Sequence, residues 1–189
     1  MSEGVLPEER LVEKWLPLAE LNIDAAAEQS FKPRSLYKRI RERLNVSSRE
    51  HSYDPKLRSI HTWWARRPCS AARAITLASV LPSDEEDNFT KIIGLTELRH
   101  IPKPFVPLLF YVSPDRQLLE KVMLKDVGRS PGKITVLDPM AGGGSIPLEA
   151  LRLGFRTIAM EYNPVAYLIL KATLEFPAKY ADSGLFEET

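Results

Sequence analysis

Residues 134–164 read ITVLDPMAGGGSIPLEALRLGFRTIAMEYNP and contain two short apolar runs separated by a glycine-rich turn. The first run, residues 134–137, consists of β-formers and predicts a strand that is buried on both faces of a parallel sheet. Asp138-Pro139 ends this strand. Three glycines at 142–144 remove side chains where the backbone must turn sharply and lie close to a ligand. The stretch therefore predicts a strand that leads into a glycine-rich binding turn.

A helix and a second strand are predicted after the glycine turn. Ser145 is the predicted N-cap of the helix, and Gly154 is its stop. Residues 157–160 form the second strand, which places Glu161 at its carboxyl end. Strand, helix and strand in this order predict a βαβ unit of an α/β protein. Doubly wound sheets of this kind bind nucleotide-like ligands in a crevice at the carboxyl ends of their strands.

The glycine turn matches neither of the common phosphate-binding patterns. The dinucleotide fingerprint G-x-G-x-x-G lacks its third glycine here, and the chain contains no G-x-x-x-x-G-K-[ST]. One alternative is an ordinary strand-to-helix turn followed by a surface glutamate. The turn opens with Asp138-Pro139, however, and so resembles the D-P-x-x-G-x-G loop of S-adenosylmethionine-dependent methyltransferases that modify exocyclic base nitrogens.

The charges of S-adenosylmethionine are compatible with an acidic residue near this loop. The molecule carries a sulfonium, an ammonium and a carboxylate but no phosphate, so an acid suits it better than a phosphate nest. Glu161 follows Asp138 by 23 positions. In dinucleotide-binding folds, an acid about 20 residues after the loop hydrogen-bonds the ribose. We therefore expect Glu161 to accept hydrogen bonds from the ribose hydroxyls of an S-adenosyl-L-methionine cofactor.

Four segments together resemble the opening of large prokaryotic adenine-specific DNA methylases, which often carry a zinc ribbon further along. That family has R-L-[IV]-E-x-x-x-P-L, H-x-W-W-A-R-R-P, D-P-x-A-G-G-G-S-I-P-L-E-A-L-R-L-G and N-P-V-A-x-L-I-L-K-A-T-L-E-x-P segments. All four occur here in that order, within residues 10–30, 58–81, 138–154 and 163–177, and cover about half of the chain. The resemblance implies an α/β protein with part of a Rossmann-like methyltransferase fold and a helical N-terminal region.

The resemblance also implies the residues of the cofactor site. The HTWWARRP segment corresponds to the element that packs beside the methionine moiety, so Arg66 or Arg67 is expected to bind its carboxylate or a substrate phosphate. Alternatively, Trp63 and Trp64 are core anchors and the arginines form structural ion pairs. The expected cofactor-binding residues are Asp138, Pro139, Met140, Ala141, Gly142, Gly143, Gly144, Glu161, Tyr162, His61 and Arg66.

The chain departs from the family in two places. Residues 31–57 separate two segments that are expected to be nearly adjacent, and they resemble a basic insertion. The [DNS]-P-P-[YFW] loop that holds the target amine is missing, since no Pro-Pro occurs in the sequence. We therefore expect a helical region over 1–57 and the cofactor-binding half of a methyltransferase domain over 58–189. The chain is expected to be inactive alone, as the N-terminal part of a longer enzyme, one half of a split protein, or a degenerate copy.

Composition predicts a soluble, cytoplasmic protein. Its 189 residues are 44% hydrophobic, enough for a sizeable core, and its net charge of +1 does not mark a strongly basic nucleic-acid binder. No apolar run is long enough to span a membrane, and the polar N-terminal stretch predicts no signal peptide. The single cysteine, Cys69, excludes an internal disulfide and a zinc site of Cys₄ or Cys₂His₂ type, and we expect it to be a small buried residue.

Several further elements follow from periodicity and capping signals. The basic, amphipathic helix expected over 35–44 is either a solvated surface or a contact to the DNA backbone. The acidic loop expected over 82–88 would repel DNA. The other expected helices cover 7–21 with a break or kink at Pro17, 22–29, 68–81, 114 to about 125 with Ser113 as N-cap and Pro114 at its first position, and the segment after Asn163.

These patterns lead to one function hypothesis and two alternatives. The hypothesis is the cofactor-binding portion of an S-adenosylmethionine-dependent DNA adenine N6-methyltransferase, whose substrate adenine is flipped out of the duplex. The first alternative is a non-catalytic module that retains the half-site and associates with a partner. The second is methylation of RNA, because the cofactor loop does not distinguish between nucleic acids.

Overall fold

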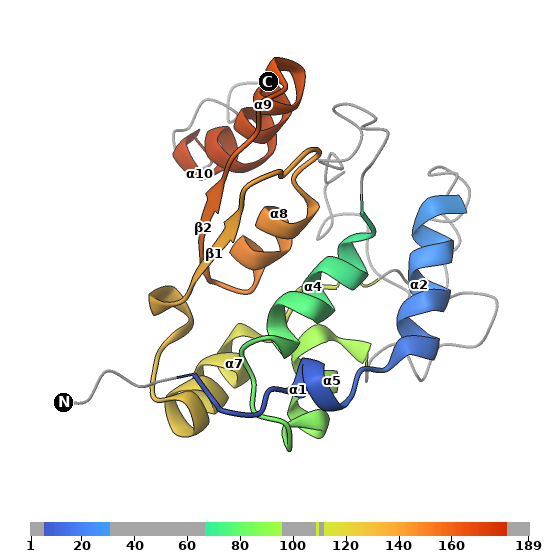
Figure 1. The fold of residues 1–189 in the computed structure, drawn as a ribbon, viewed down its shortest axis with the longest axis vertical. Coiled ribbons are helices and arrows are strands. Elements are labelled where there is room, and N and C mark those ends of the chain that lie inside the picture. The colour runs from blue at the N-terminus through green and yellow to red at the C-terminus, as the bar shows by residue number, and fades with distance from the viewer. Residues whose placement is uncertain (1–5, 31–66, 96–108, 110–111, 181–189) are drawn as a thin grey trace, which may run out of the picture.

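The computed structural model describes residues 6–30, 67–95, 109 and 112–180 (Figure 1). Helices and a two-stranded sheet alternate in its C-terminal part, whereas its N-terminal part is helical. The elements in chain order are α1 Leu11–Lys14, α2 Leu18–Ser30, α4 Cys69–Ala78, α5 Glu86–Ile93, α7 Arg116–Val122, the π-helix η3 Met123–Val127, the 3₁₀-helix η4 Pro131–Lys133, β1 Thr135–Asp138, α8 Ser145–Arg152, β2 Arg156–Ala159, α9 Pro164–Leu170, the π-helix η5 Lys171–Glu175 and α10 Phe176–Tyr180.

The predicted βαβ unit is present. Strands β1 and β2 pair in parallel, in a register that places Thr135 opposite Arg156 and Asp138 opposite Ala159. Helix α8 connects them and packs on both strands (Figure 1). The first strand begins and ends one residue later than predicted, and the second one residue earlier. This unit is one that a Rossmann-like sheet contains, and the Rossmann-like class itself remains a prediction.

The prediction that the first strand is buried on both faces is wrong. Residues alternate between exposed and half-buried along both strands. Leu137 and its register partner Ile158 are 59% and 53% exposed. Helix α8 packs on the two strands, and among the described residues nothing covers the face that carries these two side chains. The apolar composition of the strands does not result in complete burial here, because one apolar face of the sheet is open.

Two predicted helix caps are also wrong. Gly144, in a left-handed conformation, precedes α8, and Ser145 is the first helical residue instead of the cap. Helix α7 is capped by Asp115, which accepts a hydrogen bond from the Leu118 N–H at 2.9 Å, so Ser113 and Pro114 both lie before the helix. Both errors arose because several small polar residues or glycines in a row can cap a helix. Gly154, with a φ of +88°, ends α8 as predicted.

The helical part departs from the sequence prediction at two further boundaries. Pro17 interrupts the first predicted helix as expected, and α2 then runs without a break over the region predicted as a separate helix at 22–29. The acidic segment 82–88 is not entirely a loop, because α5 begins at Glu86. Acidic side chains in the first turn of a helix are stabilised by its dipole, which favours this start. The predicted helix 35–44 lies outside the described residues.

One hydrophobic core joins the helical part to the βαβ unit. Helix α4 packs against α8 on one side and α2 on another (Figure 1). Cys69 is buried, as predicted. Leu11 and Leu21, from the predicted N-terminal region, belong to the same core as Leu153 and Phe155 from the βαβ unit. The other buried members are Ala74, Leu77, Ala78, Val80, Leu81, Phe89, Ile92, Ile93, Leu95, Leu109, Leu119, Val122, Met123, Val127, Ile134 and Ala150.

A long helical segment follows β2, as predicted for the residues after Asn163. Asn163 caps α9 by accepting hydrogen bonds from the Val165 and Ala166 N–H groups at 2.9 and 3.4 Å. The segment widens into the π-helix η5 before α10. Pro177 accounts for this change, because it has no N–H to donate to the Thr173 carbonyl and its ring would clash there. Within the described residues, no helix is long and apolar enough to cross a membrane.

Candidate functional site

The glycine loop, residues 138–144, connects the carboxyl end of β1 to the start of α8. The Asp138 carboxylate accepts a hydrogen bond from the Met140 N–H at 3.2 Å, which turns the chain immediately after the strand. Gly142 and Gly144 have φ angles of +52° and +79°, which side chains disfavour. The Gly144 N–H donates to the Ala141 carbonyl at 2.8 Å and closes the turn. The local sequence therefore forms a compact, bonded loop.

Backbone hydrogen bonds attach this loop to the end of β2. The Met160 N–H donates to the Asp138 carbonyl at 2.9 Å, and the Ala141 N–H donates to the Met160 carbonyl at 3.0 Å. These two bonds continue the β1–β2 ladder past the last paired residues. The carboxyl ends of both strands, the loop and Glu161 are consequently held together. This is the edge of a parallel sheet at which α/β proteins bind ligands.

The Glu161 side chain hydrogen-bonds the backbone of the glycine loop. One oxygen of its carboxylate, Oε2, accepts from the Gly142 N–H at 2.7 Å. The other, Oε1, accepts from the Tyr162 and Asn163 N–H groups at 2.9 and 3.0 Å. The Asn163 N–H, followed by those of Gly142 and Tyr162, lowers the pKa of Glu161 below its ordinary value. The carboxylate is therefore ionised at neutral pH and faces the loop.

Gly144 is required by packing as well as by conformation. A Cβ at this position would lie 2.8 Å from Leu170 Cδ2 and 3.9 Å from Thr173 Oγ1. The start of α8 thus lies almost in contact with the helical segment after β2. The sequence predicts that this glycine makes room for a ligand. The tertiary structure adds a second reason for it, the close approach of Leu170.

The outer rim of the loop is exposed. Met140 is 83% exposed, and Tyr162 is completely exposed. Pro139 is exposed as well, whereas Ala141, Gly143 and Gly144 are buried. The structure therefore brings together nine of the eleven predicted cofactor-binding residues around one loop. The other two, His61 and Arg66, lie outside the described residues, as do Trp63 and Trp64.

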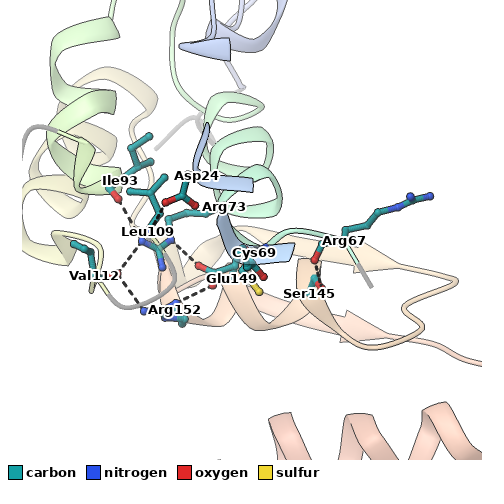
Figure 2. A network of polar contacts seen from close by, with 11 residues as sticks. Asp24, Arg67, Cys69, Arg73, Ile93, Leu109, Val112, Ser145, Glu149 and Arg152 are labelled. Carbon is teal, nitrogen blue, oxygen red and sulfur yellow. Dashed lines mark hydrogen bonds and ion pairs between the residues drawn. The ribbon is translucent and has the colours of Figure 1, made fainter. Parts of the chain in front are cut away.

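The segment that follows Arg66 reaches the start of α8. The Ser145 hydroxyl donates to the Arg67 carbonyl at 2.8 Å, while the Arg67 side chain points away from this contact (Figure 2). Arg67 itself is exposed. This bond explains what Ser145 does in place of capping α8. It also brings the end of the predicted HTWWARRP segment beside the first turn after the glycine loop.

Sequence reasoning missed a buried ionic cluster between α4 and α8. Arg73 Nε lies 2.6 Å from Glu149 Oε2, and both side chains are fully buried. Arg152 Nη1 lies 2.8 Å from Glu149 Oε1. Arg73 also donates to the Val112 carbonyl at 2.8 Å and to that of Ile93 at 3.3 Å (Figure 2). The signal in the sequence was an arginine within the small, apolar run CSAARAITLA and a glutamate between Leu148 and Ala150.

The cluster extends to α2. Asp24 accepts a hydrogen bond from the Leu109 N–H at 2.8 Å (Figure 2). The carboxylate of Glu28 accepts one from the Cys69 N–H at 2.8 Å. Burial raises the pKa of Asp24, although the Leu109 N–H opposes this shift. For Arg73, burial lowers the pKa of the guanidinium, and the Glu149 carboxylate opposes this shift. These contacts tie α2, α4 and α8 together behind the glycine loop.

A separate hollow of about 350 Å³ lies along β2. It is bounded by α8, β2 and the helical segment after β2, and it includes no residue of the glycine loop. Its lining residues are Leu151, Thr157, Ala159, Tyr167, Leu170, Lys171, Leu174 and Glu175. Lys171 forms an ion pair with Glu175, which also pairs with Lys179, so these charges already have partners. In the described part of the chain, no three histidine, cysteine or acidic side chains gather to hold a metal ion.

A family model described as "Protein of unknown function (DUF1156)" matches residues 42–95, which include the predicted HTWWARRP segment and α4. No curated protein and no solved structure matches the chain.

Proposed function

We propose that this chain is the S-adenosyl-L-methionine-binding portion of a methyltransferase that modifies the exocyclic amine of adenine in DNA. The observation that carries the proposal is the junction of the glycine loop with Glu161. A D-P-x-x-G-x-G sequence, positive-φ glycines and an ionised acid after the second strand meet at the carboxyl edge of a parallel β–α–β unit. That combination supports a cofactor with hydroxyls and no phosphate.

The chemistry of the loop fits such a cofactor. Glu161 Oε2 accepts one N–H in the structure, and a carboxylate oxygen has room for about two donors, so a ribose hydroxyl can also bind there. The exposed Met140 and Tyr162 side chains offer apolar surface beside the loop. When bound, S-adenosyl-L-methionine supplies an electrophilic methyl group. In this proposal, the loop backbone and Glu161 bind and orient the nucleoside moiety, and residues from another segment or chain position the adenine amine.

A second candidate function is a non-catalytic module that binds the cofactor and a partner protein. The open apolar sheet face around Leu137 and Ile158 favours it, because a surface of this kind is typical of a contact with another element or chain. The sequence also lacks the Pro-Pro loop that would hold the amine. Positioning of the reactants can lower a barrier by about 7–11 kcal/mol, so a chain without that loop is expected to transfer no methyl group by itself.

The experiment is calorimetric titration of the purified chain with S-adenosyl-L-methionine at millimolar concentration. Gly143→Val is expected to abolish the binding seen with the wild type, because a branched side chain would lie where the ligand approaches the loop backbone. Gly132→Val is the matched control, because a Cβ at Gly132 meets nothing within 4 Å. Circular dichroism establishes that both variants are folded. An absence of binding by the wild type, or equal binding by the Gly143 variant, would refute the cofactor assignment.

A labelled methyl-transfer assay separates the two candidate functions. The chain is incubated with unmethylated DNA, with unmethylated RNA or with neither. We expect cofactor binding without transfer. Robust transfer to DNA by the chain alone would show that a residue of this chain holds the amine and would exclude the non-catalytic module. Transfer to RNA alone would replace DNA as the substrate.

A further inference from the structure

The Glu161 carboxylate is occupied before any ligand arrives. Its two oxygens accept three backbone N–H groups, from Gly142, Tyr162 and Asn163, at 2.7–3.0 Å. Two of these donors belong to the chain immediately after Glu161, but Gly142 lies 19 positions earlier, in the glycine loop. The side chain therefore joins the turn after β2 to the loop after β1. A ribose-binding acid whose sole function is to contact a ligand would not need this connection.

We infer that Glu161 is a positioning residue. Its hydrogen bond from the Gly142 N–H, called the clasp below, attaches the glycine loop to the end of β2 and sets the loop conformation in the absence of ligand. The Gly142 N–H points inward to Oε2, and the residue holds a positive φ of 52°. Hydrogen bonds to a charged acceptor are stronger than those between neutral groups. The clasp thus fixes one of the two positive-φ glycines of the loop, and the other, Gly144, donates its N–H to the Ala141 carbonyl.

This inference deepens the proposed function and rests on it only for the identity of the ligand. A loop that is already closed loses less conformational freedom when it binds a ligand, which increases affinity. The clasp and a ligand contact are compatible, because Oε2 accepts one N–H and retains one further acceptor position. Glu161 consequently orients the loop and can still accept a hydroxyl.

The test measures the loop without ligand. Amide hydrogen exchange is followed by NMR on the ¹⁵N-labelled full chain, for the wild type, Glu161→Ala and Glu175→Ala. Glu175 is the matched control, because its carboxylate bonds the side chains of Lys171 and Lys179 and no loop amide. We expect the Gly142 amide to exchange at least about tenfold faster in Glu161→Ala than in the wild type, since a bond to a charged acceptor is lost. Amides of β1, β2 and α8 should keep their wild-type rates in both variants.

Gly142 exchange within twofold of the wild-type rate in Glu161→Ala would overturn the inference, because the Ala141–Met160 and Gly144–Ala141 bonds would then suffice to hold the loop. Cofactor affinity is not needed for this readout. A chain that binds no S-adenosyl-L-methionine but shows the Gly142 effect would refute the proposed function and retain the clasp. Normal binding of S-adenosyl-L-methionine by the wild type, together with an unchanged exchange rate of the Gly142 amide in Glu161→Ala, would refute the clasp and leave the proposed function standing.

A second measurement uses the wild type alone and applies even if Glu161→Ala does not fold. The amide proton shift of Gly142 is followed between about pH 7 and pH 2.5, where carboxylates titrate. Asp138, which accepts from Met140, is the other carboxylate of the loop, and Asp138→Asn removes its contribution. The Gly142 shift should move with a midpoint below the ordinary glutamate pKa, in the wild type and in Asp138→Asn. A Gly142 shift that does not titrate, or that follows Asp138, would overturn the clasp.

Discussion

Replacing Arg73 by methionine tests the buried ionic cluster. Methionine fills most of the space of the aliphatic stem but removes the guanidinium, whose Nε lies 2.6 Å from Glu149. The change leaves the Glu149 carboxylate buried, with Arg152 still 2.8 Å from its other oxygen. It also removes the donor to the Ile93 carbonyl. The variant therefore removes the ionic contact between α4 and α8 without creating a large cavity.

The expected loss follows from these contacts. Removing one partner of a buried ion pair costs about 3–5 kcal/mol, since an uncompensated charge remains. Arg152 places the loss near the lower limit, because it still pairs with Glu149. We expect the free energy of unfolding to fall by about 3 kcal/mol, a large part of the roughly 5–15 kcal/mol by which a domain is stable.

The measurement is urea unfolding of the wild type, Arg73→Met, Glu149→Leu and the double variant. Both members of the pair are gone in the double variant, so it should lose less stability than the sum of the single losses. Lys125→Met is the control, because that exposed lysine pairs with Asp126 at the surface and its removal should have no measurable effect. A loss for Arg73→Met as small as that of the control, or strictly additive losses, would refute the assignment of the cluster as the tie between α4 and α8.

Two further predictions concern stability. Gly144→Ala should lower the free energy of unfolding by about 1–2 kcal/mol, because Gly144 is left-handed and a Cβ would lie 2.8 Å from Leu170. Thermal melts measure this loss, and Gly132→Ala, the control, should not destabilise the chain in them. Burial raises the pKa of Asp24, so ionising this side chain costs stability. The free energy of unfolding should therefore decrease as pH rises from the ordinary pKa of 3.8 through the higher pKa of the folded state. Asp24→Asn should remove that slope, and urea midpoints measured from about pH 4 to pH 7 that keep a wild-type pH dependence would contradict it.

The sequence predicted the local features around the loop more successfully than their surroundings. The β–α–β order, the stop at Gly154, the break at Pro17 and the buried Cys69 each depend on a few neighbouring residues, and all are confirmed. The caps at Ser113 and Ser145 were assigned wrongly, because the choice among adjacent capping residues depends on contacts such as that from Ser145 to Arg67. The exposure of Leu137 and Ile158 was missed for a similar reason, since composition does not report which elements cover a sheet.

The sequence by itself determined where the chain turns. Glycines and prolines act through local backbone preference, which needs no distant partner. Only the tertiary structure decided which groups meet. Arg73 and Glu149 are 76 positions apart, and Gly142 and Glu161 are 19 apart. Hydrogen bonds and ion pairs require atoms within about 3 Å of each other. Such proximity depends on how the helices pack, and the order of residues along the chain does not specify it.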